Sequence, residues 1–317
     1  MSAKSDIVTN KKPTWTSAKS NRIKSSTSRK IFMVVNAALL SSITFICVAP
    51  LLHLLAVSLS SNHYAMAGLV SFWPRGFTTA AYEFLSGQSA FYHAFLVSIQ
   101  RVVLGTAINM TLVVLVAYPL SKEVSVFRAR TVYAWIFAFT MFFSGGLIPS
   151  FFIITRLDLI NRIWALVLPG AVNVWHAVML LNFFRGVPKE LEEAARIDGA
   201  NHLATLLKIY LPLSLPAMAT ITLFTVVGHW NAWFDGMIYM TNPINYPLQT
   251  YLATLVMQAE TATRNLMSVE DILMLADVSD MTMRTAQIFL GALPIMLVYP
   301  FLQRFFVKGI IVGSVKG

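Results

Sequence analysis

A polar stretch of the chain, Arg185–Pro212, holds residues whose types and order predict a short helix that presents a surface to a partner. Pro188 suits the first turn of a helix, where its missing N–H costs nothing. Glu190 and the glutamates after it would then lie near the positive end of the helix dipole. Gly199 suits the end of the helix, because glycine readily adopts the left-handed conformation found there. We therefore predict a helix over residues 188–200.

Small side chains follow on the same predicted helix. Ala194 and Ala195 recur with Gly199 near helical spacing, and side chains of this size let another surface approach closely. Ala200–Tyr210 can form a second helix that enters the membrane near Pro212. The alternative interpretation is an ordinary amphipathic helix that lies in the membrane interface.

The sequence contains no signature of catalysis or of nucleotide binding. It has no H-E-x-x-H motif, no G-x-S-x-G motif and no G-x4-G-K-[ST] loop. Its one cysteine, Cys47, lies in an apolar run, so an intrachain disulfide or a cysteine-based metal cluster is impossible. We therefore expect a chain that is not an enzyme, has no metal or other cofactor of its own, and does not hydrolyse ATP.

The composition places these residues in a membrane protein. Of the 317 residues, 56% are hydrophobic and only 12% are charged, against roughly 25% charged residues in soluble proteins. Such a chain cannot cover its apolar residues with a water-compatible surface. This excludes a soluble enzyme, a disordered protein and a secreted disulfide scaffold. The net charge of +10 is typical of basic inner loops rather than of nucleic-acid binding.

The chain divides at its charged residues into apolar windows. A membrane-spanning helix needs about 20 mostly apolar residues. We predict one such helix in each of six windows: Ile31–Ser60, Val102–Ser121, Thr131–Thr155, Ile163–Phe184, Ile209–Phe234 and Thr285–Gln303. Gly145-Gly146 would allow a kink in the third. A further uncharged stretch, Gly236–Ala259, contains Asn-Pro and Tyr-Pro turn signals, so we place it outside the hydrocarbon as a loop.

The basic residues predict the orientation of the chain. With the N-terminus inside, the inner segments hold 18 Lys and Arg and the outer segments hold five, which favours cytoplasmic termini. The predicted organisation is a cytoplasmic basic tail (1–30), a first transmembrane helix (31–60), an outer loop (61–91), a five-helix core (92–308) and a cytoplasmic tail (309–317).

Two outer segments are long. One spans Ser61–Phe91, and the other, Asp235–Met283, carries acidic residues in its second half. Each either contacts something outside or is a solvated loop. Arg101, near the outer end of the second helix, is expected to extend to the interface, with an anionic substrate as the other possible contact.

The polar segment resembles a family signature. Glu193-Ala194-Ala195, Gly199 and Ile209-Tyr210-Leu211-Pro212 match E-A-A-x3-G-x9-I-x-L-P, the EAA motif of the membrane subunits of bacterial ABC importers. Pro188-x-Glu190-Leu191 and Asp198-Gly199-Ala200 resemble the sugar-uptake branch of that family. The resemblance extends over Tyr92–Lys308, with the first helix as an addition.

This resemblance implies a type I ABC importer permease fold, in which the polar segment is a coupling helix that docks in a cleft of a separate ATPase subunit. Glu193 would pair with a cation or cap a helix on that subunit. The residues carried over to coupling are Glu190, Glu193, Ala194, Ala195, Asp198, Gly199, Ile209 and Pro212. The implied partners are a second permease, two ATPase subunits that bind ATP and Mg, an extracytoplasmic solute-binding protein, an oligosaccharide and lipid.

A second resemblance concerns residues 228–235, GHWNAWFD, and residues 246–252, YPLQTYL, which look like permeases for complex oligosaccharides. Aromatic faces bind the C–H surfaces of sugars, and Asn or His side chains bond hydroxyls. Four residues are therefore candidates for a substrate pathway: His229, Trp230, Asn231 and Trp233. The alternative for the tryptophans is an interfacial belt. The resemblance leaves open a neutral or an acidic oligosaccharide such as a uronate.

Other classes of membrane protein are less consistent with these residues. An ion-coupled secondary transporter usually has ionisable residues within the membrane, but the six windows contain no Asp or Glu. Their histidines, His53, His176 and His229, are interpreted as packing residues. A passive scaffold would not need the spaced motif. The sequence therefore favours a transport subunit driven by an external energy source.

Overall fold

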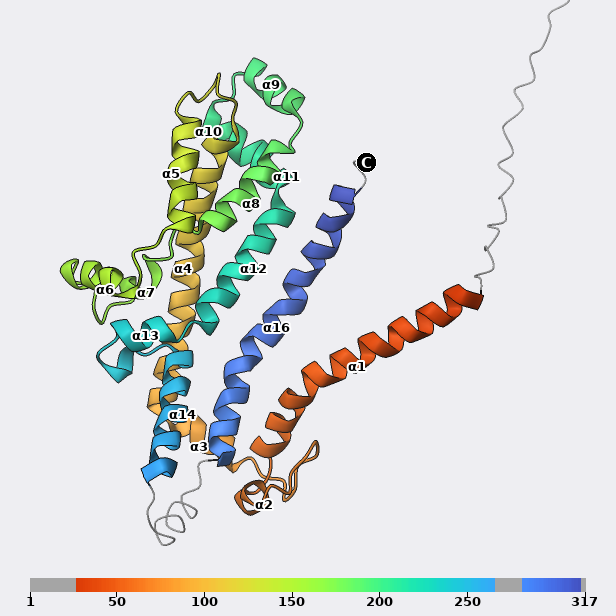
Figure 1. Cartoon of the computed structure of the whole chain (residues 1–317), viewed down its shortest axis with the longest axis vertical. Coiled ribbons are helices and arrows are strands. Elements are labelled where there is room, and N and C mark those ends of the chain that lie inside the picture. Colours follow the sequence, from red (N-terminus) through yellow and green to blue (C-terminus); the bar gives the residue numbers. More distant parts are fainter. Residues whose placement is uncertain (1–26, 266–280, 315–317) are drawn as a thin grey trace, which may run out of the picture. The chain divides into compact units, whose positions relative to one another are not determined.

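The computed structural model describes residues 27–265 and 281–314, and the regular structure within those residues is helical (Figure 1). The chain divides into two compact units, Met1–Pro50 and Leu51–Gly317. The described residues of the first unit form the beginning of α1 (Thr27–Ser58), whose apolar side chains are almost all exposed, as a helix in contact with lipid would have them.

The second unit is built around three packed helices. Helix α4 (Ser89–Ser121) packs against α8 (Val174–Arg185) and α12 (Leu215–Asn231), and α12 also packs against α16 (Met281–Ser314) (Figure 1). Their largest core cluster joins side chains from α4, α8 and α12, among them Val113, Leu180, Phe184 and Ile221. Apolar burial therefore fixes α4 at the centre of this unit.

The third predicted span is broken. Helix α5 (Arg130–Phe142) and helix α6 (Leu147–Arg156) meet at an angle of 113°. Gly146 lies in the break with φ +82°, a conformation that glycine adopts without steric cost. The prediction of a kink at Gly145-Gly146 is confirmed, but the kink is so sharp that the one helix predicted over Thr131–Thr155 is divided into two.

Two further windows are also interrupted. Helices α10 (His202–Thr205), η1 (Leu206–Tyr210) and α11 (Leu211–Leu213) lead to α12 through a bend of 81° at Ser214, between two prolines that lack backbone N–H donors. The window Ile163–Phe184 divides into α7 (Trp164–Val167) and α8, with irregular chain between them.

The described helices can be compared with the six predicted spans by their length and apolar composition. Among the described residues, three helices are long and apolar enough to cross a membrane, or up to five if each bent pair counts as one. The six predicted spans are therefore not confirmed.

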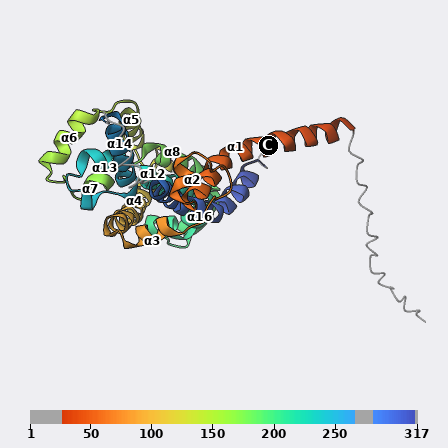
Figure 2. The same cartoon turned by 90° about the horizontal axis from the view of Figure 1, so that it is seen from below.

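The stretch predicted as a loop over Gly236–Ala259 is largely helical. It contains most of α13 (Phe234–Tyr239), the short helix η2 (Pro243–Asn245) and the first part of α14 (Leu248–Asn265). The turn signals are real, but they fall between the helices. In both ribbon views α6, α7 and α13 lie together at one side of the second unit (Figures 1 and 2).

The segment predicted as an outer loop, 61–91, includes two short helices, α2 (Asn62–Met66) and α3 (Ala80–Gly87), and α4 begins at Ser89. The second predicted helix is therefore longer than its apolar window of 20 residues, because α4 has 33 residues and begins at Ser89, 13 residues before Val102. The predictions for residues 1–26, for the acidic residues between 266 and 280 and for residues 315–317 lie outside the described residues.

Candidate functional site: an exposed helix and a polar cavity

The helix predicted from the EAA-like segment is present. Helix α9 spans Lys189–Ile197, with Pro188 at its N-terminal cap and acidic residues in its first turn. The chain turns at Gly199, whose φ of +79° places it in the left-handed region. No neighbouring heavy atom lies within 4 Å of the position a Cβ would take there, so the glycine serves the backbone conformation and leaves an open surface.

The outer face of α9 is open to a partner. Glu190, Glu193, Ala194, Asp198 and Gly199 are all exposed, and Ala195 is half-buried. Beside them the apolar side chain of Ile197 is 87% exposed. The exposed face of α9 therefore combines small side chains, acids and one apolar residue.

The opposite face of α9 is held by a buried ion pair that the sequence did not reveal. Lys122, which caps the C-terminus of α4, donates from Nζ to Oε2 of Glu192 at 2.8 Å. The Tyr210 hydroxyl donates to the same carboxylate oxygen at 2.6 Å. The ammonium also lies over the rings of Tyr118 and Tyr210, 4.2 and 4.1 Å from their centroids. We call these four residues the α9 anchor.

Burial makes the α9 anchor electrostatically strong. The side chains of Lys122 and Glu192 are only 6% and 16% exposed. Burial lowers the pKa of Lys122 by more than the hydrogen bond to Glu192 raises it. Burial also raises the pKa of Glu192, but the hydrogen bonds from Lys122 and Tyr210 outweigh this and hold the pKa below its usual range. The carboxylate is therefore ionised, and the lysine carries the larger desolvation cost.

The remaining coupling candidates connect α9 to the membrane helices. Ile209 lies in η1 and is half-buried, next to the anchoring Tyr210. Pro212 is exposed in α11, immediately before the bend into α12. The chain thus runs from α9 through η1, which carries Tyr210 of the α9 anchor, to the long helix α12. The described residues between Leu206 and Leu213 are helical throughout.

A polar cavity of about 410 Å³ lies among α4, α7, α8, α12 and α13. Asn109, His176 and Thr225 form a buried cluster on its wall. The Thr225 hydroxyl donates to Oδ1 of Asn109 at 3.1 Å, and Nδ1 of His176 lies 3.4 Å from that oxygen. Asn109 donates in turn to the carbonyl of Ala171 at 3.0 Å. The expectation that His176 is a packing residue is therefore incomplete, because its ring also borders the cavity.

An ion pair closes one side of this cavity. The guanidinium of Arg101 contacts both carboxylate oxygens of Asp235, and its Nη1 also donates to the carbonyl of Ala232 at 3.1 Å. Arg101 is 2% exposed, so the expectation that it extends to the membrane interface is wrong. Arg101 belongs to α4, but its guanidinium lies against the C-terminus of α12, and Asp235 lies in the first turn of α13, so each charge suits the neighbouring helix dipole.

The four pathway candidates lie in different surroundings. His229 lines the polar cavity and lies against Gly105, where a larger residue would collide with its ring. Trp230 is buried and packs edge-on against Phe95, and its indole N–H donates to the carbonyl of Gly291 at 2.8 Å. Trp230 therefore joins α12 to α16 and does not face an open space in this chain.

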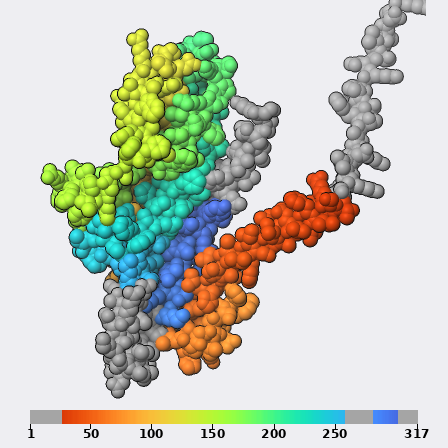
Figure 3. Space-filling model, in the orientation of Figure 1, coloured from red at the N-terminus to blue at the C-terminus, as the bar shows by residue number. Residues whose placement is uncertain are grey.

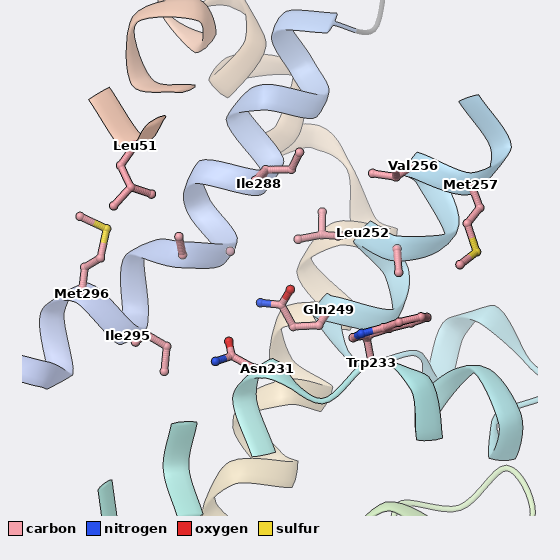
Figure 4. Close-up of a pocket in the computed structure, with 13 residues that line it drawn as sticks. Leu51, Asn231, Trp233, Gln249, Leu252, Val256, Met257, Ile288, Ile295 and Met296 are labelled. Atoms are coloured by element: carbon pink, nitrogen blue, oxygen red, sulfur yellow. The ribbon is translucent and has the colours of Figure 1, made fainter. Parts of the chain in front are cut away.

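Asn231 and Trp233 line a second, mostly apolar cavity of about 630 Å³ between α12, α14 and α16. Figure 4 shows Asn231 and Gln249 pointing into the same space, with Trp233 beside Gln249. Aliphatic residues, among them Leu252, form the remaining walls. The sequence pattern thus identified residues at two cavities but not Asn109 or Thr225, since isolated polar residues in apolar helices carry no spacing signal. Gln249 lies in the YPLQTYL stretch but is not among the pathway candidates.

The described residues contain no group of three or more His, Cys, Asp or Glu that could hold a metal ion. The polar groups of the two cavities are instead amides, hydroxyls and imidazoles, together with one neutralised ion pair. Such groups suit hydrogen bonding to a hydroxyl-rich surface more than they suit covalent chemistry.

Known proteins are similar to this chain in both sequence and backbone structure. A family model described as "binding-protein-dependent transport system inner membrane component" matches residues 117–312. The polygalacturonan/rhamnogalacturonan transport system permease protein YtcP of Bacillus subtilis (strain 168) is 36% identical over 297 residues, which cover 91% of this chain and 99% of that protein.

Two solved structures extend the comparison. A chain from a bacterial ABC transporter involved in the import of the acidic polysaccharide alginate superimposes with a TM-score of 0.78 at 32% identity, covering 89% of this chain and 99% of that chain. A chain of the bacterial alginate ABC transporter in complex with an alginate pentasaccharide-bound periplasmic protein gives a TM-score of 0.54 at 15% identity, covering 87% and 94%. At that identity the second likeness concerns the fold alone.

Proposed function

The chain belongs to the binding-protein-dependent transport system inner membrane components, and on that premise we propose that it is one of two permease subunits of an ATP-driven importer of acidic oligosaccharides. Members of this family are transport subunits in the inner membrane and are not enzymes. The observation that carries the proposal is α9, whose coupling residues are exposed on one face while Glu192 is anchored on the other.

The proposed orientation places α9 and both termini in the cytoplasm. The basic residues of the sequence support it, because the segments at the α9 end of the second unit hold Lys122, Arg130, Arg185 and Lys189. In the assembled transporter the two bent helix pairs and α7–α8 complete a type I permease core, with the first helix added to it. The backbone likeness to the alginate importer chain supports this fold.

Coupling follows from the geometry of α9. We propose that its exposed face docks in a cleft of an ATPase subunit, where Ala194 and Gly199 allow close approach and Glu193 meets a cation. Two ATPase copies bind ATP and Mg and close together, and each moves a coupling helix. Because Lys122 and Tyr210 bind Glu192, a motion of α9 is passed to α4 and to the bend before α12. The two permeases then alternate between outward and inward access.

The substrate class is proposed from the relatives and from the cavities. The names of the relatives concern polygalacturonan, rhamnogalacturonan and alginate, which are polysaccharides with uronate units. In this chain the polar cavity offers Asn173, His176 and His229 to sugar hydroxyls, and the aromatic face of Phe224 is half exposed beside them. We place the substrate pathway along this wall and along Asn231 and Trp233, with Trp230 holding α12 in position.

A solute-binding protein outside the membrane would deliver the oligosaccharide to the outer loops. The test is reconstitution of the complete transporter in liposomes, with the binding protein, ATP inside, and labelled oligogalacturonate or alginate oligosaccharide outside. We expect uptake that requires ATP and survives collapse of the proton and sodium gradients. Uptake that is driven by an ion gradient without ATP would refute the proposal in favour of a secondary transporter. Equal uptake of a neutral glucan of the same length would refute the acidic substrate alone.

A further inference from the structure

Two arginines lie together where two apolar helices end. Arg130 begins α5 and is followed by a charge-free helix, and Arg185 ends α8 after a charge-free helix. Since α5 packs against α8, both guanidiniums lie at the same end of a helix pair, and both line a groove of about 230 Å³ between them. The space-filling view places α5 at the surface of the second unit (Figure 3).

The C-terminus of α4 holds the two guanidiniums in place. Arg130 donates from Nη1 to the carbonyl of Lys122 at 3.0 Å, and Arg185 donates from Nη2 to the carbonyl of Leu120 at 3.4 Å. These carbonyls are two residues apart, so the same helix end positions both cations. A guanidinium has five N–H donors, and these bonds engage only one from each arginine. In the described part of the chain neither arginine forms a salt bridge with a carboxylate.

The groove beneath the arginines is apolar. Thr131, Ala134, Trp135 and Ala138 line it from α5, where small residues at helical spacing leave room for a hydrocarbon chain. Trp135 is 72% exposed, and tryptophan is typical of the boundary between headgroups and acyl chains. Of the three glutamates that line a neighbouring cavity with these arginines, Glu123 pairs with Lys189 and Glu192 with Lys122, while Glu193 has no salt bridge among the described residues.

We propose that this groove binds an anionic phospholipid of the phosphatidylglycerol type, with its phosphodiester between Arg130 and Arg185 and one acyl chain along Ala134 and Ala138. Guanidinium groups bind phosphate oxygens through paired N–H donors, and basic pockets between transmembrane helices are sites for anionic headgroups. The proposal rests on the membrane placement of α5 and α8 in the proposed function. It assigns a lipid, because a free anion would have no use for the apolar groove.

The experiment measures lipid binding by native mass spectrometry of the complete transporter, titrated with phosphatidylglycerol or with phosphatidylcholine. The test variant is Arg130→Gln with Arg185→Gln, and the matched control is Arg128→Gln with Lys208→Gln, which removes two exposed cations outside the groove. Each cation near an anionic surface contributes about a fivefold factor in affinity, so we expect the test variant to bind phosphatidylglycerol about 30-fold more weakly than the control.

Equal binding of phosphatidylglycerol by the two double variants would overturn the proposal. Equal binding of both lipids by the natural chain would overturn it too, and so would displacement of the lipid by inorganic phosphate at millimolar concentration. If the arginine variant does not assemble, Ala138→Trp decides, because it fills the groove and keeps both cations. Its loss of bound phosphatidylglycerol supports the proposal, and unchanged binding refutes it. Sugar uptake in phosphatidylcholine liposomes tests the importer separately.

Discussion

The α9 anchor permits a quantitative test of how α9, the proposed coupling helix, is attached. The changes are Lys122→Met, Glu192→Gln and the two together. Glu192→Gln leaves the buried Lys122 without its ionic partner, whereas Lys122→Met leaves Glu192 with only its longer ion pair to the exposed Arg196, at 3.3 Å. The double change removes both charges and retains most of the packing volume.

The magnitude follows from the geometry. At an N–O separation of 2.8 Å and an effective dielectric constant of about 20, the attraction is about 6 kcal/mol. Desolvation of both groups offsets much of this attraction, and removing one partner of a buried pair costs about 3–5 kcal/mol. Because Tyr210 still donates to Glu192 and the carboxylate keeps some solvent contact, we expect about 3 kcal/mol for Lys122→Met. The interaction energy from the double-mutant cycle should be about 2 kcal/mol.

Two assays read this change. Thermal unfolding of the purified transporter should show a midpoint lower by about 6 °C for Lys122→Met, at roughly 2 °C per kcal/mol for a chain of this size. Uptake per ATP hydrolysed should also fall, because a loosened α9 moves without moving α4. The matched control is Lys189→Met, whose pair with Glu123 is exposed and contributes little to stability. Additive single changes, or unchanged uptake per ATP, would refute the view that this anchor transmits motion.

Three further outcomes are expected. The pKa of Glu192 is lowered in the folded chain, so this carboxylate contributes to stability fully above the ordinary glutamate pKa of about 4.3. The contribution is lost as the pH falls through the pKa of the folded chain. Glu192→Gln should therefore flatten this part of the stability–pH curve. Gly199→Leu should abolish substrate-stimulated ATP hydrolysis while membrane insertion persists. Gly199→Asn should retain much of this hydrolysis, because asparagine tolerates positive φ. Normal substrate-stimulated hydrolysis in the leucine variant would contradict the docking role. Trp230→Phe should lower the free energy of unfolding by about 1 kcal/mol, because the hydrogen bond to the carbonyl of Gly291 is lost. Trp135→Phe should leave the free energy of unfolding unchanged. Equal melting temperatures of the two variants would contradict the packing role of Trp230.

The parts of the fold that follow local rules could be predicted from the sequence. The helix before Gly199 depends on a proline, a run of helix formers and a glycine in the left-handed conformation, all within a dozen residues. The break at Gly146 likewise has a local cause. The charge-free windows located the apolar helices, but hydropathy does not record where a helix bends, so the bend at Ser214 and the division of Ile163–Phe184 were missed.

Long-range pairs could not be predicted from one sequence. Lys122 and Glu192 are 70 residues apart, and Arg101 and Asp235 are 134 apart. Charge counting assigned each of these residues to a loop or to an interface, because a charge near the end of an apolar window is usually solvated. Only the packing of α4 against other helices brings the two charges of each pair together, so that their attraction offsets the cost of burying them.

Helix α4 connects the two parts of the candidate site. Lys122 follows its last turn and holds α9, and Asn109, 13 residues earlier, lies on the wall of the polar cavity. At 1.5 Å per residue the two points are about 20 Å apart along one uninterrupted helix. A displacement of α9 that keeps its anchor must therefore move Asn109 relative to His176 and Thr225 on the neighbouring helices. The buried hydrogen bonds of that cluster are thus the place where motion at the ATPase end would change the shape of the cavity.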